Sequence, residues 1–243
     1  MSNFSRWQAG TAAFLALGLT TGAVAPLVSP APVFAQTINY SDVPDNYWAK
    51  DFIIELTKMG IINGFPDGTF RPNGPVTRAQ FAAMLRQANR EEYWDKPYIN
   101  RSVVFSDVSA SFWAATSINA AIRTGFMRGY PGGIFRPEQN IPREQVFVSL
   151  ASGLGYSSTQ EPLSVLSIYD DASAIPQYAR TPIAAATANQ LVVNYPNRAR
   201  LNPKSDATRA EVAAAIYQGL VRDGKAPAIN SPYIVTPSAA TTP

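Results

Sequence analysis

Three arginines recur at nearly constant spacing, and each follows a residue that predicts the start of a helix. Arg78 and Arg143 are 65 residues apart, and Arg209 follows 66 residues later. A cation in the first turn of a helix faces the positive end of the macrodipole, which costs about 0.3–1 kcal/mol. Because this cost is repeated three times, we consider a role in anion binding. A guanidinium beside free backbone N–H groups is a good receptor for a carboxylate or phosphate.

An internal role for the arginines is equally compatible with the residues. Each could pair with an aspartate of its own or of a neighbouring repeat, namely Asp42, Asp107 or Asp171. We expect these acids to be helix caps or structural ion pairs rather than catalytic groups, because they lie next to helix starts. The residues alone leave open whether the arginines bind an external anion or close internal pairs.

The composition argues against an enzyme. The 243 residues include neither His nor Cys, which removes the commonest general base, the thiol nucleophile and the usual zinc ligands. The net charge is +3, and there is no cluster of Lys and Arg, so no nucleic-acid partner is expected. We therefore expect no catalytic residue, no metal and no cofactor.

Two tyrosines are candidates for flat contact with a sugar ring. Tyr130 follows Gly129, and Tyr195 follows Asn194 at the equivalent position. Both keep a polar tip and are predicted to reach solvent, whereas Phe65 at the same place in the first copy is predicted to pack in the core.

The arginines belong to a longer repeated pattern. Gly-Phe-Pro-Asp-Gly-Thr-Phe-Arg-Pro at 64–72 returns as Gly-Tyr-Pro-Gly-Gly-Ile-Phe-Arg-Pro at 129–137, and a weaker copy begins at 194. Pro-Asp-Gly predicts a tight turn, and Arg71 is expected to be extended because it precedes a proline. Thr77 followed by Gln80 predicts a capping box. A period of 65 residues is typical of a repeat architecture.

Each repeat is predicted to contain two helices. The first helices carry apolar residues at helical spacing and end at a glycine in the first two copies, whereas Thr181-Pro182 predicts a late start in the third. The residues at helical spacing are Trp48, Phe52, Leu56 and Met59 before Gly60, and Trp113, Ile118, Ala121 and Ile122 before Gly125. The second helices share the predicted core positions Phe81, Leu85, Val146, Leu150, Val212 and Ile216.

The first 35 residues resemble a signal peptide that is cleaved on export. Arg6 precedes an apolar run, and Val33-Phe34-Ala35 supplies the small residues of a cleavage site, so no membrane span is expected after cleavage. The predicted organisation is a signal peptide (1–35), three repeats (36–90, 105–155 and 169–222), a linker (91–104), a Ser-rich linker (156–168) and a disordered Pro/Ala/Thr-rich tail (223–243). Units of this size are marginal alone, so we expect one shared core.

This pattern resembles the S-layer homology domain family. The resemblance rests on the openings Tyr40-Ser41-Asp42-Val43 and Phe105-Ser106-Asp107-Val108, the turn segments at 64–72 and 129–137, and Thr77-Arg78-Ala79-Gln80. It implies a mainly α fold, with three tandem repeats, each helix–short extended segment–helix, in a pseudo-threefold spindle. It also implies grooves between repeats that bind pyruvylated, peptidoglycan-linked polysaccharide without a covalent bond.

The resemblance assigns candidate ligand-binding residues one by one. The Thr-Arg-Ala-Glu motif of the family corresponds to Thr77 and Arg78 and to Thr208 and Arg209, with the arginine holding the pyruvyl carboxylate. Arg143 matches by position although Pro142 replaces the threonine, and the groove glycine corresponds to Gly64 and Gly129, with Asn194 in the third copy.

The implied function is that of an exported anchor at the cell wall, the periplasmic face of the envelope or the cell surface. The alternative is a non-catalytic interaction scaffold, or a self-associating surface-layer component, whose arginines form internal ion pairs. Under the anchor hypothesis, Arg78→Ala and Arg143→Ala are expected to weaken wall binding and leave thermal unfolding nearly unchanged.

Overall fold

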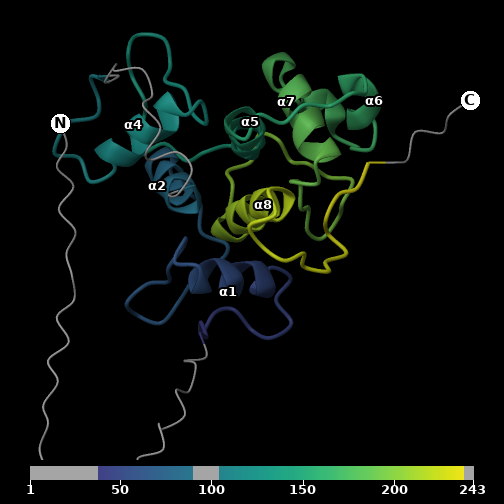
Figure 1. The fold of residues 1–243 in the computed structure, drawn as a ribbon, viewed down its shortest axis with the longest axis horizontal. Helices are drawn as coiled ribbons and strands as arrows, with labels where there is room; N and C mark the ends of the chain where they lie inside the picture. The colour runs from purple at the N-terminus through teal and green to yellow at the C-terminus, as the bar shows by residue number, and fades with distance from the viewer. Residues whose placement is uncertain (1–37, 90–103, 238–243) are drawn as a thin grey trace, which may run out of the picture. The chain divides into compact units, whose positions relative to one another are not determined.

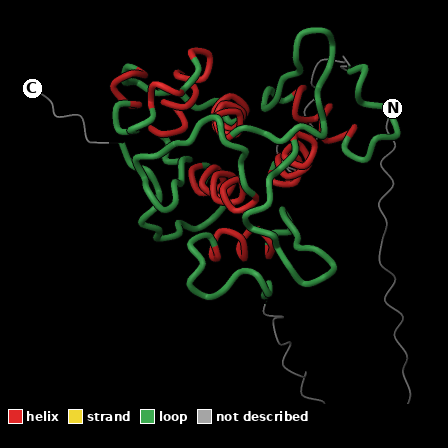
Figure 2. Tube along the Cα trace, turned by 180° about the vertical axis from the view of Figure 1, so that it is seen from behind, coloured by secondary structure: helices red, strands yellow, loops and turns green. Residues whose placement is uncertain are grey.

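The computed structural model describes residues 38–89 and 104–237, and in this part of the chain it is mainly α, as predicted. Isolated β-bridges, rather than strands, join the loops between the helices of these ranges (Figure 2). The predicted signal peptide and nearly all of the linker 91–104 lie outside the described residues. The helices are α1 (Lys50–Lys58), α2 (Arg78–Ala88), α4 (Ala115–Arg123), α5 (Arg143–Gly153), α6 (Pro162–Leu166), the 3₁₀ helix η1 (Ala172–Ala174), α7 (Gln177–Ala188) and α8 (Arg209–Arg222).

The second helix of each repeat packs against the first helix of the next repeat. α2 contacts α4, α5 contacts α7, and α8 returns to contact α1 at the beginning of the described chain. Figure 1 shows α8 between α1 and α5, and α8 contacts α2 as well. The repeats therefore form a closed ring, unlike an open solenoid in which the end repeats have one neighbour each.

Three backbone hydrogen bonds close this ring just before the second helices. The N–H of Val76 donates to the carbonyl of Ala207 (3.0 Å), Ala207 donates to Ile141 (2.9 Å), and Ile141 donates to Val76 (2.9 Å). All three residues are buried, so each bond lies in a setting where an unpaired backbone group would be costly. The predicted threefold arrangement of the repeats has this cycle at its centre.

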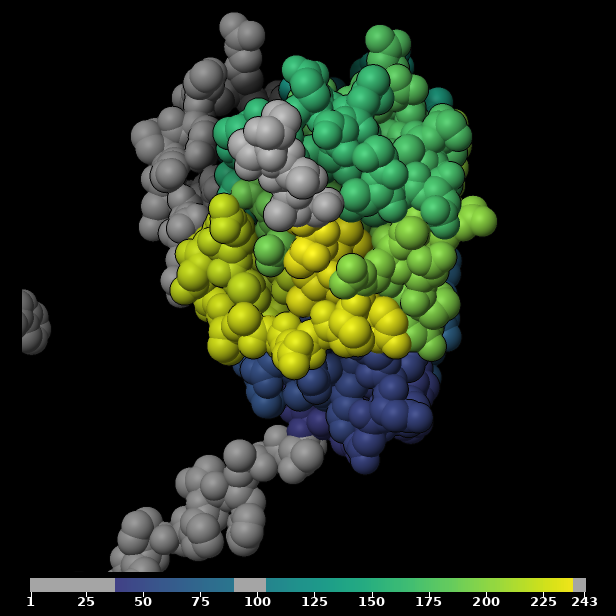
Figure 3. All heavy atoms as spheres, turned by 90° about the vertical axis from the view of Figure 1, so that its right-hand side faces the viewer, coloured from purple at the N-terminus to yellow at the C-terminus, as the bar shows by residue number. Residues whose placement is uncertain are grey.

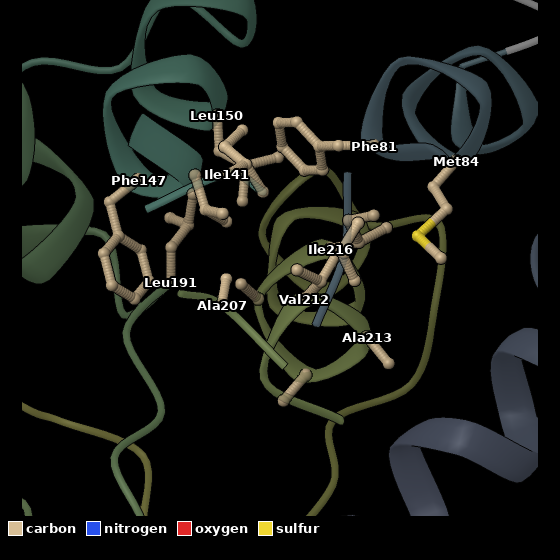
Figure 4. Close-up of a cluster of buried hydrophobic side chains, with 14 of the residues drawn as sticks. Phe81, Met84, Ile141, Phe147, Leu150, Leu191, Ala207, Val212, Ala213 and Ile216 are labelled. Carbon is tan, nitrogen blue, oxygen red and sulfur yellow. The ribbon is translucent and has the colours of Figure 1, made fainter. Parts of the chain in front are cut away.

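The shared core is built from all three second helices. Figure 4 shows Phe81 and Met84 of α2 and Leu150 of α5 around Val212 and Ile216 of α8. The core positions predicted for the second helices are all buried. A repeat alone would leave this face in water, which explains why the three units fold around one core.

The first helices differ from prediction at several points. Trp48 and Trp113, predicted to share the helical spacing, precede α1 and α4, and Met59 and Trp113 are 41% and 62% exposed. α7 begins at Gln177 and contains Pro182, so the predicted late start at Thr181 is wrong. Ala179 and Ile183 are fully buried on either side of that proline, and their packing outweighs its local cost to the helix.

The segments predicted to be linker and tail also take part in the fold. α6 lies inside the Ser-rich linker and packs Val165 and Leu166 into the core. The tail is not disordered as far as 237, because Asn194 donates to the carbonyl of Tyr233 (3.0 Å) and Val235 donates to that of Val192 (2.8 Å). Figure 3 shows this yellow segment against the blue first repeat. The apolar run at 233–235 packs against the core, and this burial stabilises the segment although the tail as a whole is rich in Pro, Ala and Thr.

Candidate functional site

The three arginines begin their helices as predicted, and their side chains turn into the next repeat. Arg78, Arg143 and Arg209 are 4%, 4% and 8% exposed. In each case the Nε–H donates at 2.8 Å to a backbone carbonyl of the next repeat, and the acceptors are Phe135, Leu201 and Phe70 in that order. The cycle of guanidinium contacts thus follows the same ring as the helix pairs.

The backbone N–H groups at the start of these helices are already paired. The amide of Arg78 donates to the carbonyl of Gln139, and that of Ala79 donates to the carbonyl of Pro137. Equivalent bonds join Arg143 and Glu144 to Ser205 and Pro203, and Arg209 and Ala210 to Gly74 and Pro72. The expectation of unpaired amides that receive an external anion is therefore wrong, because the loop of the next repeat occupies them.

The repeated aspartates bind backbone amides, so the predicted aspartate–arginine pairs are not formed. The carboxylate of Asp107 accepts from the N–H groups of Phe135 (2.8 Å) and Arg136 (2.6 Å). Asp42 does the same for Phe70 and Arg71, and Asp171 for Leu201 and Asn202. Burial raises the pKa of Asp107, but these bonds outweigh it and hold the pKa below its usual value.

The expected extended conformation of Arg71 is wrong, and the hydrogen bond from its amide to Asp42 explains why. Its φ is 58°, and the equivalent residues Arg136 and Asn202 have φ of 59° and 50°. Each of the three donates its N–H to the repeated aspartate, which stabilises a left-handed conformation that a non-glycine residue otherwise disfavours.

The three guanidinium groups differ in how their charge is balanced. Nη1 of Arg143 lies 2.7 Å from Oε1 of Glu211, a carboxylate in the third position of α8. Nη1 of Arg78 donates instead to the neutral amide oxygen of Gln145 (2.9 Å), in the third position of α5. Within 38–89 and 104–237, no carboxylate forms an ion pair with Arg78 or Arg209. Burial lowers the pKa of Arg78 and Arg209, because removing the guanidinium from water disfavours its charged form.

A hollow of about 460 Å³ lies beside Arg78, and we call it the Arg78 groove. The ring of Tyr130 has the guanidinium carbons of Arg78 and Arg136 at 4.7 and 4.5 Å from its centroid. Arg128, an exposed residue, is the second cation of the lining beside Arg78. The groove is lined by Arg78, Gly125, Phe126, Met127, Arg128, Gly129, Tyr130, Ile141, Gln145, Val148, Ser149, Ser152, Tyr178 and Pro182.

Polar atoms of the other two repeats complete the Arg78 groove. The hydroxyl of Tyr178, from the third repeat, donates to Oε1 of Glu144 (2.8 Å). Burial, together with this carboxylate, raises the pKa of Tyr178, so the phenol stays protonated at neutral pH. Among the described residues, the buried hydroxyl of Ser149, a groove-lining residue, and Oε2 of Glu144 have no hydrogen-bond partner. The groove thus combines the positive charge of Arg78 and Arg128 with the aromatic faces of Tyr130 and Tyr178.

A second hollow, of about 470 Å³, lies beside the Arg143–Glu211 pair, and we call it the Glu211 groove. Tyr195 is 48% exposed, but its ring stacks on Trp48 with centroids 5.4 Å apart and planes 6° apart. The edge of Tyr233 meets both rings. The lining consists of Pro44, Asn46, Tyr47, Trp48, Asn73, Tyr195, Thr208 and Glu211.

The predicted threonines and glycines have structural positions. Thr77 and Thr208 are the N-caps of α2 and α8, each with a complete capping box, and Thr208 also lines the Glu211 groove. A Cβ at Gly64 would lie 2.2 Å from Tyr40, and one at Gly129 would lie 2.3 Å from Phe105. Only glycine allows this close approach of the loop to the aromatic residue that opens each of these repeats.

Several groove residues were missed in the sequence. Gln145, Glu211, Tyr178 and Trp48 line the two grooves but were not among the candidates. The signal was present, because Trp48, Trp113 and Tyr178 occupy equivalent positions 65 residues apart. Each groove takes a tyrosine and a third-position residue from one repeat, Tyr130 with Gln145 or Tyr195 with Glu211, and an aromatic residue, Tyr178 or Trp48, from the repeat that follows it around the ring.

The described ranges contain no candidate membrane span and no candidate metal site. No helix there is both long and apolar enough for a membrane crossing. No group of three or more acidic side chains there could hold a metal ion.

Known proteins similar to this chain share the repeated segments. Residues 39–82, 104–147 and 168–213 match the model of the S-layer homology domain. Over 76% of its length the chain is 38% identical to an amylopullulanase from Thermoanaerobacterium thermosulfurigenes, and over 77% it is 34% identical to exoglucanase XynX from Acetivibrio thermocellus. A cellulosome-anchoring protein from Acetivibrio thermocellus is 29% identical over 45% of the chain and matched over 24% of its own length. The chain spans only 10% and 17% of the two enzymes.

Proposed function

Since the chain belongs to the S-layer homology domain family, we propose that it is a non-catalytic anchor of the cell envelope. It attaches without a covalent bond to an anionic, peptidoglycan-linked wall polysaccharide, for which a pyruvylated glycan is the best candidate. The site of action is outside the cytoplasm, at the wall or the cell surface. The cellulosome-anchoring protein among its relatives supports this role, whereas the enzymes match over too little of their length to suggest hydrolysis.

The observation that carries the proposal is the Arg78 groove. A buried guanidinium with no carboxylate partner among the described residues lies beside Tyr130, Arg128 and the unpaired hydroxyl of Ser149. A pyruvate ketal presents one carboxylate on a sugar ring, which matches a cation next to an aromatic face and a polar atom. Arg78 donates three hydrogen bonds to the protein, and a guanidinium has five N–H donors, so capacity remains for the ligand.

One observation favours the alternative of an interaction scaffold. Arg143 is closed by an internal ion pair with Glu211 and by a bond to Asn194 (2.7 Å), as the scaffold hypothesis requires of the arginines. This applies to one of the three arginines, so we retain the scaffold only as the second candidate.

The test is co-sedimentation of the protein with purified wall sacculi. We expect binding to native sacculi and loss of binding after mild acid removes the pyruvyl groups. Arg128→Gln, which removes an exposed cation of the Arg78 groove, should weaken binding. Arg200→Gln makes the same charge change on an exposed loop outside both grooves and should bind like the unaltered chain. Equal binding to native and acid-treated sacculi would support the scaffold instead.

A further inference from the structure

The chain continues past its third repeat and packs back onto the ring. The last match to the S-layer homology domain model ends at residue 213, whereas the structure describes the chain as far as 237. Val193 and Ile234 form an antiparallel bridge, and Val235 is only 3% exposed. Burial of Val235 adds to the two backbone hydrogen bonds that flank this bridge. These contacts hold residues 231–235, which we call the C-terminal strap, against the loop that carries Tyr195.

The strap places Tyr233 against both large aromatic rings of the Glu211 groove. The ring centroid of Tyr233 lies 4.9 Å from that of Tyr195 and 6.4 Å from that of Trp48, and its plane is at 82° to both. Perpendicular contacts between aromatic rings are attractive. Trp48 belongs to the first repeat and Tyr195 to the third, so Tyr233 holds the two rings together across the junction that closes the ring of repeats.

The Arg78 groove has equivalent aromatic residues without this support. Tyr130 and Tyr178 occupy the positions of Tyr195 and Trp48 in their repeats. In the described part of the chain, Tyr130 and Tyr178 neither stack on each other nor contact a third aromatic ring. The guanidinium groups beside Tyr130 take that place. The strap therefore distinguishes the aromatic wall of one groove from that of the other.

We propose that the C-terminal strap completes the Glu211 groove as a saccharide-binding site and that Tyr233 is its positioning residue. Tyr195 lines the hollow and is 48% exposed, so its ring can lie against a sugar ring while it stacks on Trp48. Because Tyr233 already holds this ring, the ligand does not have to order it, which lowers the entropic cost of binding. This inference rests on the proposed function, because it assumes that the grooves bind a wall glycan.

Two amide side chains beside this wall can bond to sugar hydroxyls. Asn46 and Asn73 are exposed and line the hollow. Oδ1 of Asn73 accepts from the hydroxyl of Tyr47 (3.0 Å), and within the described ranges nothing bonds to its Nδ2. An aromatic face next to a few polar groups is typical of a site for a small molecule.

The test is an NMR titration of the isotopically labelled full chain with a soluble wall-glycan fragment that carries a pyruvate ketal. The amide of Thr208 reports on the Glu211 groove and that of Gly129 on the Arg78 groove. For Tyr233→Leu we expect Kd at the Glu211 groove to rise about fivefold, because the ligand then has to order Tyr195. Kd at the Arg78 groove should stay the same. Tyr233→Phe keeps the ring and should bind like the unaltered chain.

The comparison of the two grooves separates positioning from a general effect on the fold. An unchanged Kd at the Glu211 groove in Tyr233→Leu overturns the proposal, and so does an equal rise at both grooves. If the fragment shifts only the Arg78 groove of the unaltered chain, the role of the strap is wrong while the proposed function stands. If it shifts neither groove and the chain does not sediment with sacculi, the proposed function itself fails.

Discussion

At the scale of single residues, the repeated arginines hold the ring together and one of them also faces an open site. Each guanidinium donates a hydrogen bond to a backbone carbonyl of the next repeat, so removal of the side chain leaves that carbonyl without this donor. This contradicts the expectation that arginine-to-alanine substitutions leave unfolding nearly unchanged. Weaker wall binding by such variants would therefore not distinguish loss of the fold from loss of the contact with the glycan.

Arg143→Ala should be strongly destabilising. It leaves Glu211 without its cation and removes the donors to Leu201 and Asn194. Breaking a buried ion pair costs about 3–5 kcal/mol, and we expect the lower end because the Glu211 side chain is 22% exposed. Urea unfolding at neutral pH measures the loss. Arg200→Ala on an exposed loop is the control and should change stability by less than about 1 kcal/mol. A similar urea midpoint for both variants would show that the ion pair does not contribute to the stability of the fold.

Asp107 should give the protein a specific dependence on acid. Because its folded pKa lies below the usual value, its charge stabilises the fold fully above about pH 4. That contribution is lost as the pH falls through the folded pKa. Asp107→Asn should therefore lower the melting temperature most above pH 4, and the difference from the unaltered protein should shrink below it. A difference that stays constant from pH 2 to pH 7 would contradict the role assigned to the carboxylate.

The residue types, but not their partners, could be predicted from the sequence. Arg78, Arg143 and Arg209 stood out because of their period and their place at helix starts. Their acceptors lie 50 or more residues away in the next repeat, and no local pattern identifies a backbone carbonyl as a partner. The aspartates were recognised as structural, yet their actual task of binding loop amides depends on tertiary placement.

At the scale of elements, the helix starts were predictable where capping chemistry is strong. Thr77 and Thr208 fix the starts of α2 and α8 because a hydroxyl and a third-position side chain satisfy two amides in each case. α7 was mispredicted because Thr181-Pro182 imitates a start within a helix whose burial is stronger than the local signal.

Thr208→Ala should cost about 1 kcal/mol of stability, because the amide of Glu211 loses the hydroxyl that accepts its hydrogen bond. Thr208→Ser keeps the hydroxyl and should remain close to the unaltered protein. Thermal unfolding of both variants measures the effect. Equal losses for alanine and serine would indicate that the methyl group of Thr208, rather than its hydroxyl, matters.

At the scale of the whole molecule, ring closure makes the three repeats dependent on one another. The pattern of two helices per repeat could be predicted, and so could a shared core. The exchange of helix partners between repeats could not, because the periodic sequence is equally consistent with first and second helices that pair within one repeat. The contribution of residues 225–237 was missed since its apolar run is short and lies in a Pro/Ala/Thr-rich context.

Hydrogen exchange should show this interdependence. The amides of Val76, Ile141 and Ala207 form one cycle, so we expect all three to exchange with the same opening free energy, close to that of global unfolding. A linear array of repeats would instead lose protection first at its ends. Faster exchange at Val76 than at Ile141 would contradict the closed ring.

The most direct test of the account is an NMR titration of the isotopically labelled protein with a wall-glycan fragment that carries a pyruvate ketal. We predict that the largest shifts fall on the Nε–H of Arg78 and the amides of Gly129 and Tyr130, and that they vanish with the esterified fragment. Shifts confined to residues outside the Arg78 groove, or identical shifts with the ester, would contradict the claim that this groove recognises an acidic wall sugar.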